Sequence, residues 1–287
     1  MTMVSSRPRG ALADLAGAFR GVTVTIVTPF LPDSLDVDCA GMRRNVDALA
    51  ASGVAVIVPA GNTGEYHSLT AEEVRTTAEL TIKEVAGRTP VAVGVGGDLR
   101  TAIALAQDAQ RFGAAGILLH EPHHTFVTDD GLYRYYADIC RAIDVGVAIY
   151  KRTPRLDDRI MLRVARDCEN VVAIKYAWND AASYVRLVQE APDRITCACG
   201  SAERWALPFS AAGTTGFTSG IANFAPALPL AFWRALQSRD ATLLPLWQQL
   251  AQIEDLRAAN ASAFNVPVVK YAMDVLGLAA GPVRPPL

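Results

Sequence analysis

One lysine of the sequence stands where an ammonium group would be costly. Lys175 follows the apolar run 171–174, which has the composition of a buried strand. Burial disfavours the charged form of an amine, so desolvation would lower the pKa of Lys175 and free its lone pair. Such an amine is the nucleophile that forms Schiff bases with carbonyl compounds. The alternative is a lysine that leaves the strand end for water or a surface ion pair.

Two hydroxyl residues follow other strand-like runs and are candidates to assist this amine. If Lys175 ends the sixth strand, Tyr150 ends the fifth and Thr63 lies just beyond the second, at the same end of a parallel sheet. Formation and dehydration of a carbinolamine require proton transfer at the carbonyl carbon, which a phenol and a hydroxyl can relay. For Tyr150 the alternative is a rim aromatic with a satisfied hydroxyl.

A glycine-flanked segment is a candidate anion site. In residues 61–65 (Gly-Asn-Thr-Gly-Glu), the two glycines let backbone amides approach a ligand. Amides arranged in this way bind a carboxylate without a formal positive charge that would further disturb the lysine. Arg152 and Arg155 on a later loop are candidates for binding a second, more distant acidic group, although each could equally be a solvated arginine.

A cluster of histidines suggests a metal site, but its context argues against one. His120, His123 and His124 lie close together with Glu121, yet no His-Glu-x-x-His helix is present and a proline interrupts the segment. A polar contact from His123 or His124 to a substrate is the preferred interpretation. No metal or organic cofactor is expected to be required.

Composition excludes several classes of function. The 287 residues include 27 Lys plus Arg and 29 Asp plus Glu, a formal charge of -2 that offers no broad cationic field for nucleic acid. No apolar run reaches the roughly 18 residues that span a bilayer, so no membrane partner is expected. The five cysteines are odd in number and lack a Cys-x-x-Cys pair, which fits a reducing cytoplasm. Residues 1–20 lack an uninterrupted apolar stretch, so we expect a short helix or ordered arm rather than a signal peptide.

Eight short, apolar, β-branched runs alternate with segments of helical periodicity. Their mean spacing of roughly 27 residues matches one strand, one helix and two loops. Continuous hydrophobicity is typical of strands covered on both faces. The pattern predicts an α/β fold, a closed (β/α)8 TIM barrel, over an open doubly wound sheet, whose free edges nothing in the sequence requires. The runs lie near residues 22–27, 54–58, 91–95, 115–119, 145–149, 171–174, 195–199 and 214–218.

Helix signals and loop lengths fit this barrel. Thr70 with Glu73 predicts a capping box, and Asp98 predicts the start of a helix that runs to Phe112. The loops that follow the strands are longer than the loops that precede them, which indicates the active face. We expect residues 1–225 to form the barrel with an N-terminal arm, and residues 226–287 to form a C-terminal helical extension of the same structural unit.

Five motifs, in order along the chain, carry a resemblance to a known family. They are the 61–65 segment, Tyr150, Ile174-Lys175, Gly200-Ser201 and the segment 281–287 (Gly-Pro-Val-Arg-Pro-Pro-Leu). Together they resemble the dihydrodipicolinate synthase/N-acetylneuraminate lyase family over nearly the whole chain. The resemblance implies a (β/α)8 barrel with a C-terminal helical extension, usually in tetramers, that forms a Schiff base between a lysine and pyruvate or another 2-oxo acid.

The resemblance also implies roles for single positions. It makes Lys175 the Schiff-base former and Tyr150 the proton relay. The implied carboxylate-binding, relay and site-lining positions are Asn62, Thr63, Gly200 and Thr218.

Three positions depart from the synthase pattern. The synthase has a second hydroxyl residue where Asn62 stands, a tyrosine that crosses to a neighbouring subunit where His124 stands, and asparagine where Lys151 stands. These differences argue against lysine biosynthesis. Residues 150–152 (Tyr-Lys-Arg) are instead similar to the branch that dehydrates keto-deoxy sugar acids, while Arg155 is retained.

The combined expectation is a Schiff-base lyase acting on a small 2-oxo acid, either a keto-deoxy sugar acid dehydratase or an aldolase. Condensation of pyruvate with an aldehyde is the alternative within this class. A barrel that binds a 2-oxo acid without catalysis, and a phosphate-binding barrel that uses Gly200-Ser201 and Ser219-Gly220, are alternatives of other classes. We expect a homotetramer or dimer.

Overall fold

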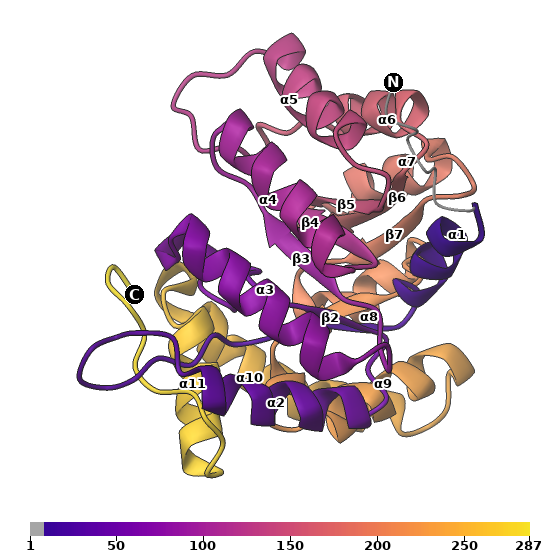
Figure 1. Ribbon diagram of the computed structural model, residues 1–287. Coiled ribbons are helices and arrows are strands. Elements are labelled where there is room, and N and C mark those ends of the chain that lie inside the picture. Colours follow the sequence, from indigo (N-terminus) through magenta and orange to yellow (C-terminus); the bar gives the residue numbers. More distant parts are fainter. Residues whose placement is uncertain (1–8) are drawn as a thin grey trace.

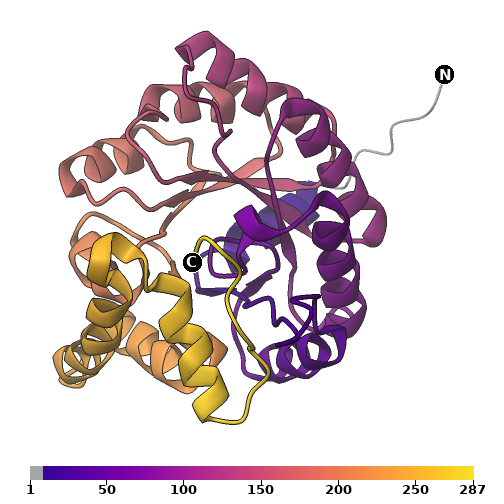
Figure 2. The same ribbon diagram turned by 90° about the vertical axis from the view of Figure 1, so that its left-hand side faces the viewer.

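Eight parallel strands form one sheet that curves into a barrel, and the computed structural model describes it over residues 9–287 (Figures 1 and 2). The strand order is β2-β1-β8-β7-β6-β5-β4-β3, and a bridge between Ile57 and Val91 joins its two edges. The predicted (β/α)8 barrel is confirmed. The strands are β1 (Val22–Thr25), β2 (Val56–Val58), β3 (Ala92–Val95), β4 (Gly116–Leu119), β5 (Gly146–Lys151), β6 (Val171–Tyr176), β7 (Thr196–Cys199) and β8 (Phe217–Ser219).

Each strand is followed by a helix that covers the outside of the barrel. The predicted capping box of Thr70 and Glu73 opens α3, and Asp98 caps α4, which ends at Phe112 as expected. These helices are α2 (Cys39–Ala51), α3 (Ala71–Val85), α4 (Leu99–Phe112), α5 (Asp129–Arg141), α6 (Asp158–Asp167), α7 (Ala181–Glu190), α8 (Ala202–Ala211) and α9 (Ala227–Ser238). Short 3₁₀ turns, Tyr66–Ser68 and Ile221–Asn223, precede α3 and α9.

An N-terminal helix fills one end of the barrel. In α1 (Arg9–Ala18) and the turn after it, Leu15 and Phe19 are buried and pack with barrel residues such as Val56 and Leu118. The part of the predicted N-terminal arm before residue 9 lies outside the described residues. Because α1 occupies this end, the opposite end, where the strands terminate, remains for a site.

Two further helices and a C-terminal tail extend over the barrel. Helix α10 (Leu243–Ser262) packs on α8 and α9, and α11 (Asn265–Val275) packs on α10 (Figure 2). Near the end of α10 the backbone leaves the helical region, and Asn260 and Ser262 have positive φ. Among the described residues, no helix combines the length and apolar character needed to cross a bilayer. The proposed division at residues 225 and 226 stays a prediction.

Candidate active site

Lys175 lies at the inner wall of the open end of the barrel. Alternation along β6 turns Lys175 to the interior, where it is only 4% exposed and lines a cavity of about 660 Å³. Burial, aided by the positive charge of Arg152, lowers the pKa of Lys175 to about 7. A large fraction of this amine is therefore neutral at physiological pH.

Tyr150 lies directly beside the amine. Tyr150 on β5 is the register partner of Lys175 on β6, and the Lys175 Nζ lies 4.1 Å from the centre of the Tyr150 ring. Tyr150 is the penultimate residue of β5 rather than its last, because the strand continues to residue 151. Burial raises the pKa of Tyr150, and the nearby Arg152 opposes this rise. The phenol thus keeps its proton and is placed to pass it to a group bound at Lys175.

The glycine-flanked segment after β2 forms another wall of the same cavity. Asn62 and Thr63 line it together with Arg152, whose guanidinium donates a hydrogen bond to the Asn62 Oδ1. Arg152 also hydrogen-bonds the side chain of Tyr150. Gly200 and Thr218 line the cavity from the ends of β7 and β8. The fold therefore brings seven candidate positions of the sequence together, these five and the two residues Lys175 and Tyr150.

Glu121, which the sequence offered only as a possible metal ligand, holds the loop of Arg152 in place. Its carboxylate accepts hydrogen bonds from the backbone N–H of Arg152 at 2.5 Å, and from the N–H and hydroxyl of Thr153 at 2.8 and 2.6 Å. A half-buried acceptor in the loop after β4 thus fixes the loop after β5. Sequence inspection misses this role because it depends on contacts between loops of different strands.

Arg155 lines a second cavity of about 410 Å³, which shares Asn62, Tyr150 and Arg152 with the first. The Arg155 Nη1 donates to the carbonyl of His124 at 2.7 Å. His124 itself lines neither cavity, so the structure does not bring this candidate to the site.

The other histidines of the second cavity form a hydrogen-bonded pair and a buried ring. His67 and His123 are hydrogen-bonded at 2.8 Å, and His120 stacks on Tyr66. Burial lowers the pKa of His67 to about 4 and that of His120 to about 3. Within residues 9–287, no three His, Cys, Asp or Glu side chains gather as a set of metal ligands.

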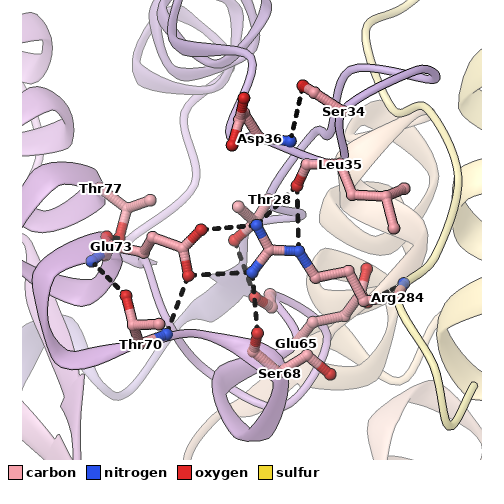
Figure 3. A network of polar contacts seen from close by, with 11 residues as sticks. Thr28, Ser34, Leu35, Asp36, Glu65, Ser68, Thr70, Glu73, Thr77 and Arg284 are labelled. Carbon is pink, nitrogen blue, oxygen red and sulfur yellow. Dashed lines mark hydrogen bonds and ion pairs between the residues drawn. The ribbon is translucent and has the colours of Figure 1, made fainter.

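The C-terminal tail supports the segment 61–65 from behind. Figure 3 shows the Arg284 guanidinium between the Glu73 carboxylate and the carbonyls of Leu35 and Ser68. The Arg284 N–H donates to the Glu65 carboxylate at 2.9 Å, and Glu65 has a left-handed φ of 55°. Residues far apart in sequence thus hold the last position of the glycine-flanked segment.

Lys270 completes this support with a buried ion pair, and its replacement should destabilise the fold. The Lys270 Nζ lies 2.6 Å from the Glu65 carboxylate, with both side chains almost fully buried. Lys270→Met would leave a buried carboxylate uncompensated, so we expect the free energy of unfolding to fall by about 3–5 kcal/mol. Denaturant titration measures this loss. The double variant Lys270→Met/Glu65→Gln should recover part of it, and a loss below about 1 kcal/mol in the single variant would contradict the expectation.

The C-terminal extension adds charged groups that the sequence did not reveal. Glu254 and Arg257 of α10 line the main cavity and form an ion pair of 2.5 Å. The guanidinium lies against Gly220, where a Cβ atom would come within 2.4 Å of it. Glycine at this position therefore lets α10 contribute a cation to the cavity wall.

The arrangement has the parts of a Schiff-base site, and comparison with known proteins identifies its family. The model of the dihydrodipicolinate synthetase family matches residues 18–287. The chain belongs to the dihydrodipicolinate synthetase family. The family predicted from the motifs is thus confirmed, and with it the assignment to class I Schiff-base lyases.

Relatives within the dihydrodipicolinate synthetase family differ in the activities that they are named for. A probable 5-dehydro-4-deoxyglucarate dehydratase of Xanthomonas campestris is 36% identical over 265 residues, covering 91% of this chain and 87% of the relative. A protein of the same name from Rhodococcus opacus is 32% identical, and the match covers 99% of this chain and 94% of the relative. The crystal structure of dihydrodipicolinate synthase from Oceanobacillus iheyensis matches with a TM-score of 0.93 and 35% sequence identity. The match covers 96% of this chain and 93% of that one.

Proposed function

We propose that the chain is a dehydratase of a keto-deoxy sugar acid, of which 5-dehydro-4-deoxyglucarate is the leading candidate, and that it acts through a Schiff base on Lys175. One observation carries the assignment of the amine: a buried lysine whose pKa is lowered to about 7 lies against the ring of Tyr150 in the main cavity. The names of the sequence relatives support the substrate class.

The proposed reaction starts with the 2-oxo acid bound by its carboxylate. The backbone of the segment 61–65 and the side chain of Asn62 hold this group. The neutral Lys175 attacks the carbonyl carbon, and Tyr150 with Thr63 passes protons as the carbinolamine loses water. The resulting iminium makes the adjacent C–H acidic, so loss of that proton gives an enamine, which expels the β-hydroxyl.

Trapping with borohydride tests the covalent step. Pyruvate and sodium borohydride should leave a permanent adduct on Lys175, which peptide mass mapping can separate from Lys83, Lys151 and Lys270, the other lysines of the chain. A passive binding barrel would stay unmodified. If no keto acid gives an adduct, the proposed function is contradicted.

Condensation of pyruvate with an aldehyde is the second candidate, because solved structures that resemble this chain are named dihydrodipicolinate synthase. The substitutions at Asn62, His124 and Lys151 weigh against it. Assays of pyruvate with several aldehydes, run beside a panel of keto-deoxy acids, decide between them. Product formation only from the acids supports the dehydratase.

Arg155 is proposed to bind the acidic group at the far end of the substrate. It lines the cavity next to that of the amine, and its guanidinium donates a hydrogen bond to a backbone carbonyl. Because hydrogen bonds to charged groups contribute about 1.5–3 kcal/mol, Arg155→Ala should lower kcat/KM for a dicarboxylic substrate by about 10–100-fold. For a monocarboxylic analogue, kcat/KM should change little in the same variant.

Kinetics with the two substrates measure this selectivity. Arg159→Ala, which removes an exposed arginine paired with Asp157, is the matched control and should change neither value. An equal fall for both substrates in Arg155→Ala would show that Arg155 supports the loop rather than the distal group.

We also propose a cytoplasmic homotetramer or dimer. The cysteines of the described residues are all free thiols, which suits a reducing compartment. Tyr271 and Val275 on α11 are 72% and 66% exposed, and Leu276 after them 59%, which is typical of a surface that packs in an assembly. Light scattering of the purified protein tests the assembly.

A further inference from the structure

A buried acid lies behind the main cavity and has no role in the steps above. Glu203, in the first turn of α8, is 0% exposed. One of its carboxyl oxygens, Oε1, is hydrogen-bonded to the hydroxyl of Ser219, and the other, Oε2, has no protein partner. Buried carboxyl groups without a cationic partner of their own are costly as anions, so Glu203 is better accommodated with a proton.

The groups around Glu203 favour its protonated form. Glu254 and Arg257 from α10 already neutralise each other in an ion pair, and Cys199 faces the group from β7. Burial and the negative charge of Glu254 raise the pKa of Glu203 to about 8, against a smaller opposing effect of Arg257. Glu203 therefore carries a proton at neutral pH and can give it up to a neighbour of suitable basicity.

Ser219 connects this acid to the cavity. The residue lines the main cavity at the end of β8, on the same wall as Arg257. Its Oγ accepts a hydrogen bond from the N–H of Ala222 at 2.9 Å, which fixes its position. When Glu203 is protonated, its O–H can donate to the Ser219 Oγ, which frees the hydroxyl proton of Ser219 for a group in the cavity.

We propose that Glu203 supplies, through the hydroxyl of Ser219, the proton that the departing hydroxyl of the substrate takes during dehydration. This inference rests on the proposed dehydratase function. It assigns the general acid that protonates the leaving hydroxyl, a role that the steps described for Lys175 and Tyr150 leave unfilled. Glu203 does not touch the substrate in this scheme, so it is a positioning residue that acts through Ser219.

The proposed step balances. The carbon–oxygen bond breaks with its electron pair on oxygen, and that oxygen takes the proton of Ser219 and leaves as water. The electrons of the enamine form the new carbon–carbon double bond and restore the iminium. Ser219 takes the proton of Glu203, and the resulting carboxylate faces Arg257. A proton from solvent then restores Glu203. It replaces the C–H proton that the substrate released to solvent when the enamine formed, so the net change is the loss of one water molecule.

The pH dependence of kcat/KM is the first test. Activity should rise as pH increases through about 7, where Lys175 becomes neutral, and fall through about 8, where Glu203 loses its proton. Tyr150 and Cys199 titrate above this range, because burial raises the pKa of Tyr150 and brings that of Cys199 to about 12. The fall near pH 8 is therefore specific to Glu203 among these groups.

Variants of the relay provide the second test. Glu203→Gln keeps the size of the side chain but removes the acid, so dehydration should slow by about 10²–10⁴-fold and the fall near pH 8 should disappear. Ser219→Ala should slow the reaction similarly, and the double variant should be no slower than either single one. Glu254→Gln should move the fall to lower pH, because it removes the negative charge that raises the pKa of Glu203.

Trapping of the pyruvate imine separates the possible failures. Glu203→Gln should form the adduct at the wild-type rate, which shows that the variant is folded and that only the later step is slow. Asp108→Asn, a carboxylate-to-amide change at an ion pair on α4, is the matched control and should leave the pH profile unchanged. An unchanged rate or an unchanged fall near pH 8 in Glu203→Gln overturns the relay, whereas a wild-type protein that forms no imine overturns the proposed function itself.

Discussion

Lys175→Ala should form no borohydride-stable adduct with pyruvate and should turn over its substrate at the uncatalysed rate. The chain has no second amine in the main cavity among its described residues, because Lys83, Lys151 and Lys270 do not line it. Without a covalent iminium the substrate lacks an electron sink, so neither the C–H nor the C–O bond is activated. This is the largest effect that we expect from any single substitution.

Intact-protein mass spectrometry after borohydride reduction measures the adduct, and a coupled assay measures turnover. The rate of imine formation in the wild type should increase with pH through about 7 and then level off, since only the neutral amine attacks. Lys83→Ala, at an exposed position paired with Glu79, is the control and should match the wild type. Adduct formation in Lys175→Ala would place the nucleophile elsewhere.

Tyr150→Phe should lower the rate of imine formation and kcat by about 10²–10⁴-fold, the usual contribution of a positioned acid–base group. The ring would still pack against the Lys175 amine, so substrate binding should change little. The substitution removes only the hydroxyl that we propose as the proton relay at the carbonyl carbon and that Arg152 hydrogen-bonds. The loss should therefore appear in kcat rather than in KM.

Single-turnover kinetics with pyruvate isolate this step. Tyr133→Phe removes a phenol that bonds Asp167 on the outer surface, and it should leave the rate unchanged. A near-normal rate in Tyr150→Phe would remove this residue from the relay and leave Thr63 as the remaining hydroxyl of the proposed pathway.

Some parts of this site were accessible from the sequence because they depend on local patterns. Apolar runs of four to six residues recur at the spacing of a barrel, and the ends of parallel strands meet at one face. Lys175 and Tyr150 could therefore be placed together without coordinates, and the register of β5 and β6 makes them neighbours. His124 shows the limit of such prediction, since it lies on a loop beside the site but lines neither cavity.

The sequence by itself determined the barrel, the family and the amine at its mouth, because residue type and spacing along the chain are sufficient for these. Only the tertiary structure decided which charges surround the amine. Arg257 and Glu254 reach the cavity from a helix that lies about eighty residues beyond Lys175, and Glu203 holds its proton because packing removes water from it. Distances across the fold and desolvation set these properties, and neither is written in a local stretch of sequence.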